Sequence, residues 1–296
     1  MNKGFVFAVL TALISGISVF LNGIAVKLSD PIAYTLMKNS GALIFLVAIV
    51  FMFREWHRFQ HLSRKQIGYL VLIGVIGGSI PFAMFFIGLS MSGAAVSSFI
   101  FRSLFLFAGI FGYLMLKENI EPKHVLAGLL ILAGNFLLIP EEIVFGAGNL
   151  LVLGATALWA LEYTVSRKVM QDLHPRVVMV SRMLFGSAAL LVFLASTGAL
   201  AVVALDAELI TWLFITSLML TGFLVTWYTA LKHLEVLKAT SILATGGIVT
   251  AVLNLVFLGK AVSLVDAFAL GLILLGAAVM TSIWELFRSN PVPVVR

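Results

Sequence analysis

Three positively charged side chains fall inside long apolar stretches of this 296-residue sequence. Lys38 and Arg182 each stand seven residues after a proline, and Arg102 lies in a third stretch. Inside a membrane such a side chain costs about 2.5 to 3.5 kcal/mol unless it is paired or faces water, so it marks a candidate binding pathway. Arginine offers a planar fork that suits carboxylates, whereas lysine acts as a mobile point charge. The three residues therefore predict a site for the carboxylate or phosphate group of a solute.

Glu162 is the carboxylate that falls well inside an apolar stretch, and it stands level with Arg182. At about 1.5 Å per helical residue, Glu162 lies about 21 Å from the outer end of its stretch, and Arg182 lies about 10 Å from the inner end of the next. In a hydrocarbon core about 30 Å thick the two side chains meet, so we predict an ion pair. The pair could hold helix register as a structural clasp, or it could guard Arg182 as an inner contact for the solute.

Lys38 and Arg102 have no matching carboxylate and lie about 10 and 12 Å inside the outer ends of their stretches. One alternative is that their long stems carry the charges out to the lipid headgroups. Polar residues at the same level, among them Asn22 and Asn39, favour a wet cavity instead. Aromatic residues could wall an apolar part of the solute or could pack the helices; the candidates are Phe82, Phe85, Phe86, Trp159, Tyr163, Trp227 and Tyr228.

Two glycine pairs are candidates for gating. The motif "GGSIPF" places Gly77, Gly78 and Pro81 in the middle of a stretch, where proline frees a carbonyl and glycine allows a bend. Gly246 and Gly247 form the second pair. Close helix packing through small residues is the alternative for both pairs.

The composition places all these residues in a membrane. Apolar residues make up 61% of the sequence and charged residues 11%, against roughly half and a quarter in soluble proteins. The first apolar stretch lacks a small-residue cleavage site, so we expect it to be retained as a span. We expect an all-α integral membrane protein with ten transmembrane helices: Gly4 to Lys27, Pro31 to Phe53, Gln66 to Ser90, Ala94 to Leu116, Pro122 to Ile139, Gly148 to Gln171, Arg176 to Thr197, Leu209 to Lys232, Val236 to Leu258, and Leu264 to Leu286.

The charges between the segments orient them. With a cytoplasmic N-terminus, the outer loops hold only the cations Lys27 and Lys260, and the other loop cations fall inside. The positive-inside rule then places both termini in the cytoplasm and the chain in a cell membrane, inner or plasma, among lipids. The net charge of +6 belongs to these loops, so we expect no nucleic-acid partner.

The sequence also repeats itself. Lys38 and Arg182 stand 144 positions apart, as do the prolines before them, and Ser18 is then the counterpart of Glu162. Because each repeat has five helices, the second enters the membrane in the opposite sense, as in the inverted repeats of secondary transporters. We expect a first repeat at 1–140, an outer linker at 141–147 and a second repeat at 148–296.

Four motifs are spread over nearly the whole chain: "LWALEYTVSRKV" (158–169), "LKHLEVLKAT" (231–240), "LKEN" (116–119) and the glycines of "AGLLILAGN" (127–135). Together with the ten segments, they resemble the drug/metabolite transporter superfamily, in its EamA-like branch. The resemblance implies a ten-helix carrier that moves a small organic solute, often outward. Members commonly carry a proline in spans four and nine and a glutamate after span nine, where this chain has 102–105, Gly246-Gly247 and Lys260.

Enzyme classes lack their chemistry here. All five histidines fall in loops or at segment ends and no aspartate lies inside a segment, so an intramembrane hydrolase has no general base at depth. No cluster of His, Asp or Glu shares a face to hold a metal, and the lack of cysteine excludes disulfides and thiolate sites. We predict no catalytic residue, no metal and no cofactor.

We expect a secondary carrier that works by alternating access and exports or exchanges a small organic anion or zwitterion, such as an amino acid or a related metabolite. A carrier for neutral or cationic amphiphiles, with the buried charges serving as structural pairs, is one alternative. An anion-selective channel is another. The solute's identity, its coupling to protons and the oligomeric state are left open.

Overall fold

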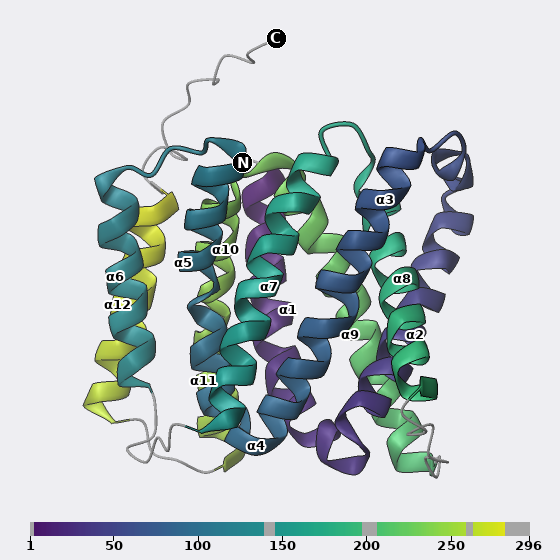
Figure 1. Ribbon diagram of the computed structural model, residues 1–296. Helices are drawn as coiled ribbons and strands as arrows, with labels where there is room; N and C mark the ends of the chain where they lie inside the picture. The colour runs from purple at the N-terminus through teal and green to yellow at the C-terminus, as the bar shows by residue number, and fades with distance from the viewer. Residues whose placement is uncertain (1–2, 139–145, 197–205, 259–262, 282–296) are drawn as a thin grey trace.

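The computed structural model describes residues 3–138, 146–196, 206–258 and 263–281, and this part of the chain is helical (Figure 1). Its α-helices are α1 (Lys3–Ala25), α2 (Pro31–Met52), α3 (Arg64–Ile73), α4 (Ile80–Arg102), α5 (Leu104–Phe111), α6 (Pro122–Leu137), α7 (Ala147–Val169), α8 (Pro175–Ser196), α9 (Ala207–His233), α10 (Val236–Ala244), α11 (Gly246–Leu258) and α12 (Leu264–Thr281). Short 3-10 helices lie at Val26–Leu28 and Trp56–Phe59, and π-helical segments at Gly74–Ser79 and Gly112–Leu116. Lys260, most of the predicted linker 141–147 and the predicted segment ends at Ile139, Thr197 and Leu286 lie outside the described residues.

The predicted all-α membrane fold with ten passes is confirmed. Among the described residues, seven helical stretches are long and apolar enough to cross a membrane. The apolar helices α6 and α12 are shorter, and the more polar α7, which is the sixth pass along the chain, brings the number of passes to ten. The third pass runs longer than predicted, to Gly93, whose positive φ of 77° lets the chain turn directly into the fourth pass.

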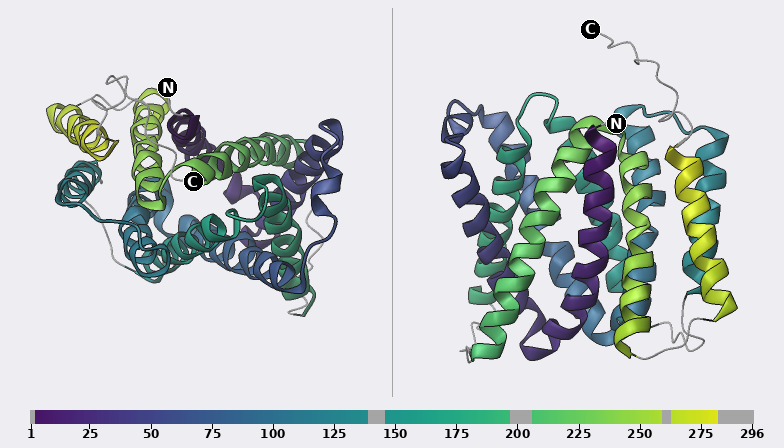
Figure 2. Two further views of the ribbon diagram at one scale, coloured as in Figure 1. Left: turned by 90° about the horizontal axis from the view of Figure 1, so that it is seen from above. Right: turned by 180° about the vertical axis from the view of Figure 1, so that it is seen from behind.

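The two halves of the chain run in opposite senses (Figure 1). Helix α1 begins at the face of the bundle that carries Lys3, which we call the N-terminal face, whereas its counterpart α7 ends there. The same reversal relates α2 to α8. Seen from above, α6 and α12 lie side by side at one edge of the bundle (Figure 2).

The packing of α6 against α12 repeats the symmetry at atomic detail. A Cβ added at Gly134 would lie 2.5 Å from the carbonyl oxygen of Ala269, and one added at Gly276 would lie 2.7 Å from that of Ala127. The same number of positions separates Gly134 from Gly276 as separates Ala127 from Ala269. Each helix therefore presents one glycine that lets the other backbone approach closely, as small residues do in membrane bundles.

Passes four and nine are each broken at an equivalent hydroxyl residue. Helix α4 gives way to α5 at Ser103, and α10 gives way to α11 at Thr245. At both breaks the hydroxyl donates to the carbonyl three residues earlier at 2.6 Å, Ser103 to Ile100 and Thr245 to Ile242. Such local bonds compete with regular helix hydrogen bonding. Paired breaks in matching passes are typical of inverted-repeat transporters near their binding sites.

Candidate functional site

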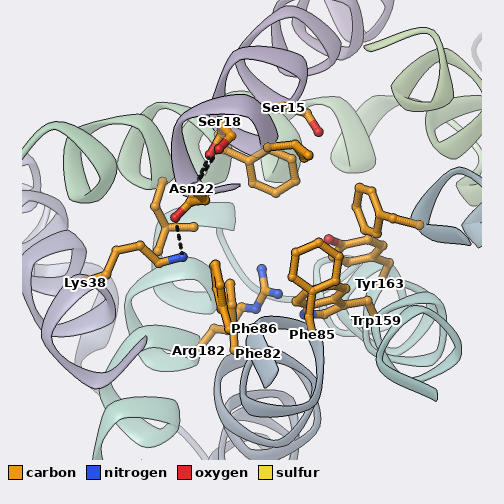
Figure 3. Close-up of a pocket in the computed structure, with 14 residues that line it drawn as sticks. Ser15, Ser18, Asn22, Lys38, Phe82, Phe85, Phe86, Trp159, Tyr163 and Arg182 are labelled. Carbon is orange, nitrogen blue, oxygen red and sulfur yellow. Dashed lines mark hydrogen bonds between the residues drawn. The ribbon is translucent and has the colours of Figure 1, made fainter. Parts of the chain in front are cut away.

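A cavity lies in the middle of the bundle, with walls from both halves of the chain (Figure 3). Its volume, measured as the space open to the centres of water-sized molecules, is about 80 Å³. One water molecule requires roughly 10–15 Å³ by the same measure. Lys38 reaches it from two turns inside one face and Arg182 from two turns inside the other. Helix α1 contributes the polar Ser15, Ser18 and Asn22, and most of the remaining wall is aromatic: Phe82, Phe85, Phe86, Phe101, Trp159, Tyr163 and Phe223.

The Lys38 ammonium group is buried and faces this cavity, because the residue is only 2% exposed and lines the wall. Its Nζ lies 3.8 Å from the centroid of the Phe86 ring and 5.1 Å from that of Phe82, distances at which aromatic faces attract a cation. It also donates a long hydrogen bond of 3.4 Å to Asn22 Oδ1. No carboxylate in the described ranges lies within 4.0 Å of this Nζ. The lysine points into the protein rather than toward the lipid headgroups, and it has no carboxylate partner among the described residues.

Asn22 is held so that its carbonyl oxygen faces Lys38. Its Nδ2 donates to the carbonyl oxygen of Ser18 at 2.7 Å. The hydroxyl of Tyr34 lies 3.0 Å from Asn22 Oδ1 and 2.9 Å from Thr216 Oγ1, which ties α1, α2 and α9 together. Tyr34 was absent from the predicted site, although its place four residues before Lys38 puts both on one helix face.

The predicted ion pair between Glu162 and Arg182 is confirmed. Arg182 Nη2 lies 3.5 Å from Glu162 Oε2, and both side chains are at most 1% exposed. Glu162 Oε1 accepts hydrogen bonds from the hydroxyls of Tyr228 at 2.6 Å and Ser166 at 2.5 Å. Arg182 lines the cavity, whereas Glu162 does not. The carboxylate therefore neutralises the guanidinium without itself facing the solute space.

The "GGSIPF" motif shapes the wall around this pair. Pro81 has no N–H, so the carbonyl of Gly77 four residues earlier lacks its α-helical donor, and the segment Gly74–Ser79 that contains Gly77 is π-helical. The Gly77 oxygen accepts from Arg182 Nη2 at 2.9 Å and from Trp159 Nε1 at 3.0 Å. A Cβ added at Gly77 would lie 2.4 Å from Glu162 Cγ. Glycine and proline thus make the close contact and the free carbonyl that fix the ion pair here.

Asn39 and Trp227 are buried but do not line the cavity. Asn39 Nδ2 donates to the carbonyl of Gly78 at 2.9 Å, which ties α2 to the π-helical turn. The Trp227 ring packs edge-on against Tyr163 with centroids 4.7 Å apart. Both side chains support the wall from behind.

Arg102 lies apart from the cavity, where α4 meets α10 and α11. It is 2% exposed, and its Nη1 donates to the carbonyl of Leu243 at 3.1 Å, beside the break in pass nine. A Cβ added at Gly246 would lie 3.0 Å from that Nη1, and one at Gly247 would lie 3.3 Å from Nε. The three cations that the sequence places in one site are thus divided between two places, and the second glycine pair packs against Arg102.

Ionic contacts at the N-terminal face join the two halves. Glu118, in the loop before α6, lies 3.0 Å from Arg167 Nε at the end of α7 and accepts from the Val236 N–H at 3.0 Å. Arg167 also donates to the carbonyls of Leu231 and Leu234. We call these five residues the N-face latch. Burial raises the pKa of the Glu118 carboxyl, and this outweighs the opposing effects of the Val236 N–H and Arg167.

The match to a known family agrees with this architecture. The model of the EamA-like transporter family matches residues 2–139 and, a second time, residues 146–282. The chain belongs to the EamA-like transporter family. The resemblance predicted from the motifs is therefore confirmed, and this EamA-like transporter is a multi-pass membrane protein that acts as a transporter and not as an enzyme.

Curated relatives of this EamA-like transporter are named only as transporters. A Clostridium kluyveri protein, "Uncharacterized transporter", is 26% identical over 213 residues, which cover 67% of each chain. A Bacillus subtilis protein, "Uncharacterized transporter YyaM", is 25% identical over 161 residues, covering 51% of this chain and 52% of its own. The matched part thus spans between about half and two thirds of these relatives.

A solved structure described as "Crystal structure of protein" shares the architecture. It is similar over 98% of this chain and 99% of its own, with a TM-score of 0.79 and 17% sequence identity. At this level of identity the likeness shows the shared fold alone.

Proposed function

We propose that this EamA-like transporter carries a small organic anion or zwitterion, such as an amino acid or a related metabolite, and exports or exchanges it. The observation that carries the proposal is the buried Lys38 ammonium, which faces the cavity with no described carboxylate to balance it. A carboxylate on the solute would supply the missing charge. Because Lys38 is buried, that attraction would be stronger than between exposed charges.

The walls of the cavity fit the remainder of such a solute. Three phenylalanines pack around Trp159, with ring centroids at 5.1 Å for Phe82, 5.2 Å for Phe85 and 5.5 Å for Phe101. These rings would contact an apolar group. Ser15 on the α1 wall could hydrogen-bond an amino or hydroxyl group. The small volume favours a solute of amino-acid size.

Transport by alternating access would require the N-face latch to open. Glu118 joins the loop before α6 in the first half to α7 and α10 in the second, whereas the bond from Arg167 to Leu231 lies within the second half. Rocking of inverted repeats about a central site would break these bonds on one side and form contacts on the other. With the cation-rich N-terminal face placed in the cytoplasm, the latch would be the cytoplasmic gate.

Thermal-shift screening of the purified protein tests the solute class. Amino acids, organic acids, sugar phosphates and quaternary amines would be compared in the wild type, in Lys38→Gln and in Lys27→Gln, a control that removes an exposed cation. We expect stabilisation by one group of carboxylates or phosphates, lost in Lys38→Gln and kept in Lys27→Gln. Stabilisation by quaternary amines alone would overturn the proposal in favour of a carrier for cationic amphiphiles.

Counterflow in proteoliposomes then separates a carrier from an anion channel. A carrier preloaded with unlabelled solute accumulates labelled solute transiently, and its uptake saturates. Uptake that never exceeds equilibrium and does not saturate would show a channel instead.

A further inference from the structure

A second, smaller cavity lies between α4, α6 and α11, and it shares no lining residue with the Lys38 cavity. Its volume by the same measure is about 50 Å³, which is more than one water molecule requires. Its wall is polar for a membrane protein, because Ser98, Asn135, Thr250 and Asn254 all line it. A polar cavity between apolar helices is suited to a polar ligand.

The Arg102 guanidinium stands directly behind this wall and is poorly satisfied. Its Nη2 lies 3.4 Å from both Ser98 Oγ and Thr250 Oγ1, at the long limit for a hydrogen bond. Its Nε has no hydrogen-bond partner in the described part of the chain. Only the bond from Nη1 to Leu243 has ordinary length. A buried cation with idle donors is costly unless a further acceptor comes to it.

Gly247 lines the cavity and lies against the guanidinium. A Cβ at this position would lie 3.3 Å from Arg102 Nε and 2.9 Å from Asn135 Oδ1, and Gly247 itself lines the cavity. Any side chain here would cover the Nε. Arg102 does not itself line the cavity, but the lining residues Ser98, Gly247 and Thr250 lie against its Nε and Nη2, and at Gly247 no side chain covers the Nε.

We propose that Arg102 forms a second anion site, which binds a small oxyanion in the cavity between α4, α6 and α11. The Nε and Nη2 donors would hold two oxygens of a phosphate or carboxylate side by side, as guanidinium groups do, and Ser98 and Asn254 would donate from the wall. The cavity reaches Leu138 and Asn254 near the ends of α6 and α11 away from the N-terminal face. The phosphate could come from solution or from the headgroup of an anionic lipid. The site stands apart from the solute cavity and does not rest on its proposed function.

Two arms of one experiment distinguish the sources. In neutral phosphatidylcholine nanodiscs, inorganic phosphate is titrated at constant ionic strength and the thermal midpoint is followed. In a second set without phosphate, nanodiscs containing phosphatidylglycerol are compared with phosphatidylcholine alone. We expect a saturable rise of the midpoint in at least one arm, lost in Arg102→Gln and kept in Lys38→Gln.

Two glycine substitutions, Gly247→Ala and its control Gly271→Ala, test the site even if Arg102→Gln folds poorly. Gly247→Ala would cover the Nε while leaving every charge in place. We expect it to lower the affinity for phosphate at least about tenfold, equivalent to 1.4 kcal/mol. Gly271→Ala is the matched control, because a Cβ there would meet no atom within 4 Å. No rise in either arm, a rise that survives both Arg102→Gln and Gly247→Ala, or a rise lost only in Lys38→Gln would each overturn the site.

Discussion

The two halves of the chain place a cation at the same position of the repeat, yet they balance it differently. In the second half Arg182 meets Glu162, whose other oxygen is held by Ser166. In the first half Lys38 meets Asn22, the counterpart of Ser166, and the carboxylate position is filled by Ser18. In the part of the chain that the structure describes, Arg182 thus has a carboxylate partner and Lys38 does not.

The difference shows how an inverted repeat can keep its geometry while dividing its tasks. Both cations reach the cavity from matching depths. The clasped arginine fixes the π-helical turn through the Gly77 carbonyl, whereas the lysine is surrounded by aromatic faces that attract a cation but carry no net charge. Under the proposed function, the cation of the first half pairs with the carboxylate of the solute, whereas the cation of the second half holds the π-helical segment of the wall in place.

Breaking the Glu162–Arg182 ion pair should have the largest effect, a loss of stability against unfolding. Glu162→Gln leaves the buried Arg182 without its carboxylate, and removing one partner of a buried pair costs about 3–5 kcal/mol. Unfolding followed by a thermal or denaturant midpoint should show this loss. Ser166→Ala is the control, because it deletes one hydrogen bond, at about 1 kcal/mol, and keeps the pair. Equal stability of Glu162→Gln and the wild type would mean that the two halves do not differ as described.

Placing a carboxylate beside Lys38, as Glu162 lies beside Arg182, should abolish solute binding without unfolding the protein. Ser18→Glu places a carboxylate where the repeat puts Glu162, so we expect it to neutralise Lys38 and to remove the stabilisation by anionic solutes. Ser18→Gln has nearly the same size without the charge and should keep part of that stabilisation. Titration of both variants with the stabilising solute checks this. An undiminished response in Ser18→Glu would show that the solute does not use Lys38.

The smallest expected effect is on the opening of the N-face latch, which should depend on pH. Burial raises the pKa of Glu118 in the latched state, so protonation favours that state, and the preference is lost as pH rises through this pKa. We expect the latch to open more often as pH rises from mildly acidic values, by no more than severalfold. Glu118→Gln cannot titrate and should abolish the trend.

Cysteine labelling can follow this opening, since the natural sequence contains no cysteine. Ala239→Cys places a thiol at a fully buried position one turn below the latch. The exposed Lys168→Cys serves as the reference that corrects for the pH dependence of the thiol itself. A ratio of the two labelling rates that does not change with pH, or that changes equally in Glu118→Gln, would contradict the role of Glu118.

Much of the fold follows from patterns that can be read along the chain. Segment length and composition give the ten passes, because a bilayer fixes how long an apolar helix must be. Depth arithmetic places Glu162 level with Arg182, and the two side chains meet beside the π-helical segment Gly74–Ser79, which packs against both α7 and α8. The recurrence of Lys38 and Arg182 gives the inverted repeat.

Other features depend on the rotation of each helix about its axis, which depth alone does not give. Arg102 has the depth of the Lys38 cavity but points to α10 and α11. Asn39 follows Lys38 directly and therefore points elsewhere, to the π-helical turn. The N-face latch was missed because three distant motifs form it, and only their meeting in space shows what Glu118 and Arg167 do.

The central claim is that Lys38 binds the negative group of the solute, and comparing one solute with its own amide tests it most directly. Equilibrium binding of the stabilising carboxylate and of the matching carboxamide would be measured in the wild type, Lys38→Gln and Lys27→Gln. We predict that the wild type and Lys27→Gln prefer the carboxylate by at least about tenfold, or 1.4 kcal/mol, and that Lys38→Gln loses this preference. A preference that persists unchanged in Lys38→Gln would contradict the account.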